Sequence, residues 1–198
     1  MPLEIRRDVL ASFTARLQEP RRFLQVVAGP RQIGKTTLVR QALAFLEDSH
    51  AKHPGKTIAQ HSVSADNPGL VGAGWLNSQW ETARALASQA GACVLVLDEV
   101  QKLPGWTEEV KRLWDEDTRT GRDVRAVVLG SAPLLLSRGL TESMAGRFEM
   151  TRLGHWRYSE MREAFGFTLD QFIYYGGYPG AAGLTATRNA GLPTCAMP

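Results

Sequence analysis

Apolar residues along the chain form two kinds of pattern. Largely apolar runs, typical of strands buried on both faces of a parallel sheet, cover residues 23–28, 93–97 and 124–131. Two further strands are expected at 57–63 and 148–153, from their extended, β-compatible composition. The chain therefore supplies several candidate strands for one sheet.

Between these runs, apolar residues recur every three or four positions, the spacing of a helix that buries one face. Helices are expected on four stretches: Val9, Phe13 and Leu17; 37–46; Leu76, Trp80, Ala83 and Ala87; and 106–119. Gly121 is expected to end the last of these helices, and the tryptophans are interpreted as core residues rather than a base-stacking platform. Strands that alternate with helices predict an α/β fold, a three-layer sandwich with a central parallel sheet.

Composition and charge narrow the class of protein. The 198 residues, 43% of them hydrophobic, can bury one sizeable core. The net charge is +3 and the pI about 9.1, with the basic surplus in residues 1–40, where a polyanionic nucleotide or DNA would explain it and a solvated helix face is the alternative. Cys93 and Cys195 lie in different settings, so no disulfide framework is implied. Without an apolar leader or a span of ~20 apolar residues, a cytoplasmic protein with no membrane association is expected.

Residues 29–36 complete the phosphate-loop pattern G-x-x-x-x-G-K-[ST], with a strand before it and a helix after it. Glycines in the loop let successive backbone N–H groups point at phosphate oxygens, and the following helix adds the positive end of its dipole. Lys35 is expected to reach the β- and γ-phosphates, and the Thr36 hydroxyl to bind Mg²⁺. The predicted nucleotide-binding residues are Gly29, Pro30, Arg31, Gln32, Ile33, Gly34, Lys35, Thr36 and Thr37.

The strand at 93–97 ends in two acidic residues, Asp98 and Glu99. Because ligands of parallel sheets bind at the carboxyl ends of the strands, both fall where the nucleotide would lie. Asp98 is the predicted second Mg²⁺ partner, and Glu99 the predicted general base that polarises a water against the γ-phosphate.

Ser131 stands at the end of another expected strand, at the same edge of the sheet. Its hydroxyl could orient the attacking water or sense the γ-phosphate. The alternative is an N-cap for a helix starting near residues 132–133, and the two roles are compatible.

Five motifs occur in the order and spacing of a prokaryotic AAA-like ATPase family: 29–37, 97–101, 129–131, 142–147 and 176–179. The chain resembles that family over residues 1 to about 184. The resemblance implies the additional-strand P-loop fold, in which the Ser131 strand lies between the phosphate-loop strand and the Asp98 strand. It also implies ATP and Mg²⁺ as ligands, with Lys35 and Glu99 among the residues that act on them.

The same resemblance implies a role for Arg147, in the Ala-Gly-Arg element, as an arginine that reads or stabilises the γ-phosphate, in cis or from a neighbouring subunit. A structural role ahead of the strand at 148–153 is the alternative. In the family, a helical C-terminal domain of uncharacterised function usually follows the ATPase domain, and this chain looks shortened there.

Four regions are expected along the chain: an N-terminal helix packing on the core (1–20), a P-loop ATPase core (21–155), a helical segment at the start of a shortened C-terminal region (156–184) and an irregular tail (185–198). A protein client or DNA would be reached through the missing domain, and the oligomeric state is left open.

The leading functional hypothesis is Mg²⁺-dependent ATP binding and hydrolysis that drives a conformational switch. A regulatory ATP-binding module with little turnover, acting with DNA, is the alternative, and Glu99 discriminates because such a module needs no base. Phosphotransfer to a small acceptor is disfavoured since no acceptor site is visible, and GTP because no Asn-Lys-x-Asp motif occurs.

Overall fold

The computed structural model describes residues 7–52, 57–66, 74–131 and 144–184. In this part of the chain the strands form one sheet in the order β2-β3-β4-β1-β5, and every pairing is parallel. The strands are β1 (Leu24–Ala28), β2 (Thr57–Ser64), β3 (Gly91–Asp98), β4 (Val124–Gly130) and β5 (Phe148–Arg152). The predicted parallel sheet is confirmed, and β4 lies between β1 and β3 as the resemblance implied.

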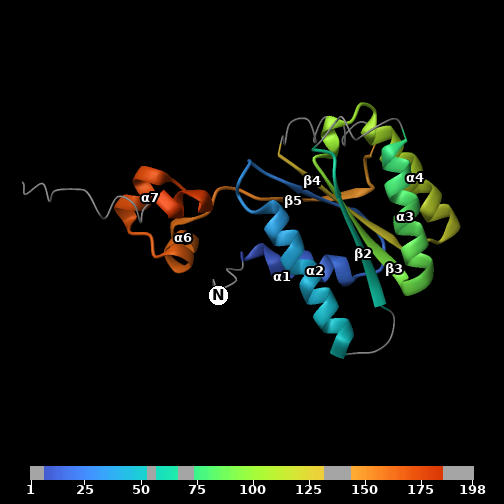
Figure 1. Ribbon diagram of the computed structural model, residues 1–198, viewed down its shortest axis with the longest axis horizontal. Helices are drawn as coiled ribbons and strands as arrows, with labels where there is room; N and C mark the ends of the chain where they lie inside the picture. The colour runs from blue at the N-terminus through green and yellow to red at the C-terminus, as the bar shows by residue number, and fades with distance from the viewer. Residues whose placement is uncertain (1–6, 53–56, 67–73, 132–143, 185–198) are drawn as a thin grey trace, which may run out of the picture.

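Helices cover both faces of this sheet, with α1 and α2 on one side and α3 and α4 on the other (Figure 1). The four helices are α1 (Val9–Gln18), α2 (Lys35–Lys52), α3 (Trp75–Ala90) and α4 (Trp106–Thr120). Successive side chains of a strand point to opposite faces. In β3, Val94 and Val96 accordingly pack with α1 and α2, whereas Leu95 and Leu97 pack with α3 and α4. The sheet thus separates two cores, and the three-layer prediction is confirmed.

The tryptophans predicted as core residues are buried between α3, α4 and the sheet. Trp80, Trp106 and Trp114 all belong to this core. Gly121 follows α4 with φ of 68°, a left-handed conformation that suits glycine, and ends the helix as expected. No helix in the described part of the chain is both long and apolar enough to span a membrane.

A smaller cluster of helices stands beside the sheet, at the left of Figure 1. It contains α6 (Tyr158–Phe165), α7 (Leu169–Tyr175) and the single turn η3 (Pro179–Ala181). These elements enclose their own small core of Trp156, Met161 and Phe167. Residues 158–165 and 169–175 are thus helical.

Cys93 lies in the middle of this fold, fully buried in β3. Burial raises the pKa of its thiol to about 11 because the thiolate would be desolvated. The thiol therefore stays protonated and behaves as a small apolar side chain. Cys195 lies outside the described residues.

A buried polar network joins α3 to α4. The Asp117 carboxylate accepts hydrogen bonds from the Trp80 indole at 2.6 Å and from Arg84 Nε at 2.7 Å. Arg84 also donates to Glu81 and to the Leu113 carbonyl. The side chain of Asp117 is 0% exposed and that of Arg84 5%, so both charges need partners, and Arg84 pairs with Glu81 and Glu116 as well as with Asp117.

We expect Asp117→Ala to lower the free energy of unfolding by about 3–5 kcal/mol, because it removes the buried carboxylate that accepts from both the Trp80 indole and Arg84 Nε. Denaturant unfolding followed by circular dichroism measures the change. Glu109→Ala is the matched control: it breaks a surface pair with Arg112, whose side chain is 51% exposed, and should cost less than about 1 kcal/mol. Equal losses for the two variants would contradict this account of the network.

Candidate functional site

The phosphate loop connects the end of β1 to the start of α2. The structure begins α2 at Lys35, two residues earlier than the sequence suggested, because the Leu38 N–H already donates to the Gly34 carbonyl at 2.9 Å. The N–H groups of the first helical turn lack carbonyl partners within the helix. These donors and the helix dipole make the loop an anion-binding site.

Gly29 is required by its surroundings. A Cβ atom at this position would lie 2.2 Å from the Leu153 carbonyl oxygen and 2.5 Å from Ile33 Cδ1, far inside contact distance. Gly34 has φ of 90°, where other residues are strained. Both glycines of the motif therefore have a steric reason in this structure.

Lys35 is nearly buried and lies over the loop. Its ammonium donates to the carbonyl oxygens of Gly29 at 2.9 Å and Pro30 at 2.7 Å. Burial lowers the pKa of the Lys35 ammonium, while the neighbouring Glu99 and Asp98 act in the opposite direction. An anion in the loop would give this cation a stronger partner than two neutral carbonyls.

Thr36 and Asp98 come together from different elements. The Thr36 hydroxyl, in the first turn of α2, lies 3.5 Å from Asp98 Oδ2 at the end of β3. Burial raises the pKa of the Asp98 carboxyl, and the adjacent Glu99 raises it further. A hydroxyl and a carboxylate are hard oxygen ligands, and a cation between them would relieve the crowding of negative charge. The residues present therefore fit a bound Mg²⁺.

Glu99 and Ser131 also meet, from adjacent strands. The Ser131 hydroxyl donates to Glu99 Oε2 at 3.1 Å, and the Gln101 amide donates to the same oxygen at 2.6 Å. The helix that Ser131 was expected to cap falls on residues 132–143, which lie outside the described residues.

Backbone strain in the described chain coincides with this site. Gln32 and Glu99 are its non-glycine residues with positive φ, at 62° and 55°. Such conformations cost about 1–3 kcal/mol and gather at ligand sites. One lies in the phosphate loop, and the other carries the predicted base.

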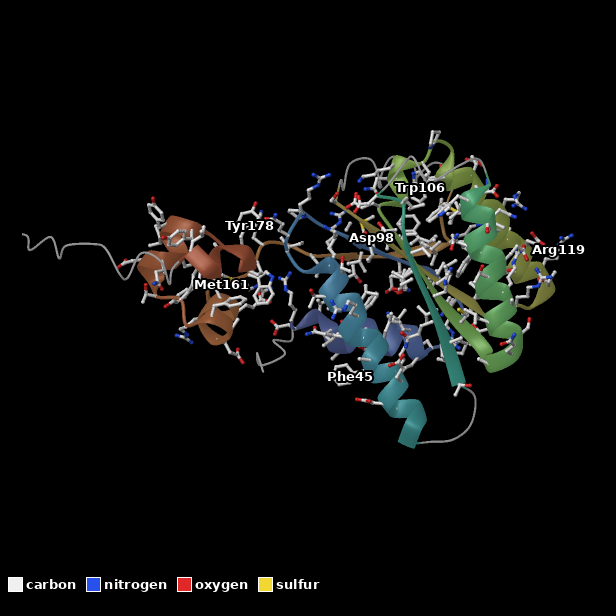
Figure 2. The ribbon with its side chains drawn as sticks, viewed as in Figure 1. Phe45, Asp98, Trp106, Arg119, Met161 and Tyr178 are labelled. Atoms are coloured by element: carbon white, nitrogen blue, oxygen red, sulfur yellow. The ribbon has the colours of Figure 1, made fainter. Side chains whose placement is uncertain are left out.

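Lys35, Thr36, Asp98 and Glu99 line one cavity of about 1280 Å³, and Ser131 joins them through its hydrogen bond to Glu99. The four lining residues lie on the side of the cavity formed by the sheet and α2. Residues of the C-terminal helical cluster line another side: Trp156, Phe165 and Pro179. Figure 2 shows Asp98 in the sheet body, with Tyr178 and Met161 in the helical cluster beside it. The volume exceeds the range of about 300–1,000 Å³ that is usual for small-molecule and cofactor pockets, so a nucleotide would not fill the cavity.

The helical cluster is tied directly to the phosphate loop by Trp156. The indole N–H of Trp156 donates to the Ile33 carbonyl at 2.9 Å, inside the loop. The Arg7 guanidinium lies 5.5 Å from the Trp156 ring centroid and pairs with Glu160 at 3.1 Å. The chain ahead of α1, the loop and α6 are thus joined through one side chain.

The Gly-Gly-Tyr-Pro element supports this tryptophan from below. The backbone N–H of Trp156 donates to the Gly177 carbonyl at 2.9 Å. A Cβ on Gly177 would lie 2.0 Å from the Trp156 carbonyl oxygen. The close approach explains why glycine stands at this position.

Arg147 is not brought to the cavity. Its guanidinium pairs with Asp115 of α4 at 2.7 Å, and its carbonyl accepts the Leu24 N–H at the start of β1. The phosphate loop follows the other end of that strand, which is about 15 Å away at the rise of an extended chain. The geometry therefore contradicts a role in cis at the γ-phosphate, and the structural alternative describes its contacts.

Trp156, Gln101 and Arg7 were not among the residues predicted for the site. Gln101 is the last residue of the motif at 97–101, but nothing in the sequence indicates which way its amide points. Arg7 precedes the loop by more than twenty residues, and Trp156 lies 123 residues after Ile33. Only the fold brings these two side chains to the loop.

Comparisons with known proteins agree with this geometry. The model of a family described as "AAA domain" matches residues 21–162. No curated protein sequence matches the chain.

Solved structures resemble the chain in fold. The Aeropyrum pernix ORC2 protein in ADPNP–ADP complexes has a TM-score of 0.59 and 19% identity, covering 79% of this chain and 48% of that one. A variant of Thermotoga maritima RuvB has a TM-score of 0.52 and 24% identity, covering 79% and 45%. The Aeropyrum pernix ORC1 protein in complex with DNA has a TM-score of 0.59 and 16% identity, covering 90% and 54%. This chain spans about half the length of these structures.

The bond from Trp156 to the loop generates a prediction about stability. Trp156→Phe keeps an aromatic ring but leaves the buried Ile33 carbonyl without its donor, which should lower the free energy of unfolding by about 1–3 kcal/mol. The control is Trp106→Phe, which is equally buried at 7% exposure and whose indole N–H has no partner in the described chain. If urea unfolding gives the two variants the same loss in free energy of unfolding, the hydrogen bond from Trp156 to Ile33 does not contribute to stability.

Proposed function

The chain belongs to the AAA domain family, and from this premise we propose that it binds ATP with Mg²⁺ and hydrolyses it to drive a conformational switch. The observation that carries the proposal is the convergence of Lys35, Thr36, Asp98 and Glu99 on one cavity, with Ser131 hydrogen-bonded to Glu99. They come from α2 and from the ends of β3 and β4, and their side chains match the needs of phosphate, metal and water.

The loop and Lys35 would bind the phosphates. In the structure the Lys35 ammonium rests on the Gly29 and Pro30 carbonyls. On binding, it would exchange these acceptors for phosphate oxygens, which are better partners because they carry charge. The N–H groups at the start of α2 supply the remaining donors.

Thr36 and Asp98 would hold the metal, through hydroxyl and carboxylate oxygens. Bound Mg²⁺ would neutralise charge on the phosphates.

Glu99 would act as the general base on an attacking water. Its Oε2 accepts hydrogen bonds from Ser131 and Gln101, while its Oε1 accepts none from the described residues. That second oxygen is the one available to take a proton from water. Ser131 would orient the carboxylate and does not need to touch the nucleotide.

The alternative is a regulatory module that holds ATP with little turnover and acts with DNA. A specific observation favours including DNA: the ORC1 structure that resembles this chain is a complex with DNA. The DNA contacts belong to that protein, and about half of its length lies outside the match. ATP turnover measured with and without duplex DNA distinguishes the two functions.

We expect Mg-ATP to raise the melting temperature of the protein. A ligand that binds only the native state at 100 times its dissociation constant adds about 2.7 kcal/mol of stability. Lys35→Ala should abolish most of the shift, whereas Lys111→Ala, on α4 at the far face of the sheet, should keep it. A thermal scan in which Lys35→Ala shifts as much as the unsubstituted protein would reject the binding assignment.

We expect Glu99→Gln to retain nucleotide affinity and to slow hydrolysis by about 10²–10⁴-fold, the usual contribution of a positioned base. Asp98→Asn should instead raise the Mg²⁺ concentration needed for half-maximal turnover. Phosphate release under single-turnover conditions measures both. Undiminished hydrolysis in Glu99→Gln would place the base elsewhere.

A further inference from the structure

The side-chain amide of Gln101 donates a hydrogen bond to the carboxylate of Glu99, two residues earlier in the chain. Its amide nitrogen lies 2.6 Å from Glu99 Oε2. An ionised carboxylate only accepts hydrogen bonds, so the side of the amide that faces it must be the NH₂ group. The orientation of Gln101 is therefore determined by chemistry.

The turn that carries Gln101 is rigidly anchored. It is the 3₁₀ turn η2 (Val100–Lys102), which follows Glu99 directly. Val100 is fully buried in the core beneath it, and Lys102 pairs with Asp66, which follows the neighbouring strand β2. The Lys102 N–H donates to the Glu99 carbonyl at 3.0 Å. Because Val100 and Lys102 are both held in place, the backbone position from which the Gln101 side chain extends is fixed.

The contact has a cost that stability alone does not explain. The Oε1 atom of Gln101 is buried, and within the described structure it accepts no hydrogen bond. A buried acceptor without a partner destabilises a fold, and such groups in native proteins call for a functional explanation. Glu99 itself has φ of 55°, a second local strain at the same point.

Resting on the hydrolytic function proposed above, we propose that Gln101 is a positioning residue for the general base. Gln101 and Ser131 both bind Oε2 of Glu99, from its own turn and from the end of β4. Two donors on one oxygen fix the plane of the carboxylate and leave Oε1 for the attacking water. Gln101 touches neither nucleotide nor metal in this arrangement, and it acts only through Glu99.

The variant Gln101→Met tests this role, since methionine has a similar length and no donor. Losing a hydrogen bond to a charged group should slow single-turnover ATP hydrolysis by about tenfold. The dissociation constants for ATP and ADP should change less than about twofold. The matched control is Gln79→Met, a half-buried glutamine on α3 whose side chain bonds His61 at 2.9 Å, and it should leave the rate unchanged.

A double-mutant cycle separates positioning from a structural role. In the Glu99→Gln background, where the base is already absent, Gln101→Met should cause no further loss of rate. An equal loss in both backgrounds, or loss of nucleotide binding, would overturn the proposal, because Gln101 would then act on the fold. An unchanged rate for Gln101→Met alone would overturn it as well.

The same measurements tell this inference apart from the proposed function. If the unsubstituted protein binds ATP but does not hydrolyse it, the hydrolytic function fails and the role of Gln101 fails with it. If the unsubstituted protein hydrolyses ATP and Gln101→Met does so equally fast, only the inference fails.

Discussion

Three main-chain hydrogen bonds at the carboxyl edge of the sheet hold the site together. Beyond the strand ends, the N–H groups of Gly29, Glu99 and Leu153 donate to the carbonyls of Gly130, Leu129 and Ala28. Each bond extends the parallel ladder by one step past its last regular residue. The start of the phosphate loop, the predicted base and the exit from β5 are thereby fixed relative to one another. Residues from four separate strands can form one site because the ladder fixes their register.

The same close packing connects the nucleotide site to the C-terminal helices. Leaving β5, the chain passes so near the loop at Leu153 that only glycine fits at position 29. Three residues after Leu153, the Trp156 indole donates to the loop carbonyl of Ile33. Arg7 binds Glu160 behind this contact. The loop is thus joined to the segment ahead of α6 by one hydrogen bond, and the chain ahead of α1 is joined to α6 by one ion pair. The match to the AAA domain family, over residues 21–162, includes both Trp156 and Glu160.

Much of the fold was predictable because its signals are local. Apolar runs marked β1, β3 and β4, and helical spacing marked α1, α3 and α4. The place of β4 between β1 and β3 followed from the family resemblance, and the sheet confirms it. Asp98 and Glu99, at the end of β3, line the same cavity as Lys35 and Thr36 because the phosphate loop also lies at the carboxyl edge of the sheet. Arg147 is different: it also stands beside a strand, but at the amino end, where it pairs with Asp115.

The sequence by itself determined the phosphate loop, the acidic end of β3 and the α/β class, since each depends on residues adjacent in the chain. The tertiary structure alone decided which side chains meet across the chain. In the folded chain the Trp156 indole donates to the Ile33 carbonyl, Asp117 pairs with Arg84, and Arg147 pairs with Asp115 away from the cavity. Even for Gln101, two residues from Glu99, the contact depends on the turn η2, which begins at the buried Val100. Side-chain direction depends on packing against distant elements, and a linear pattern contains no record of it.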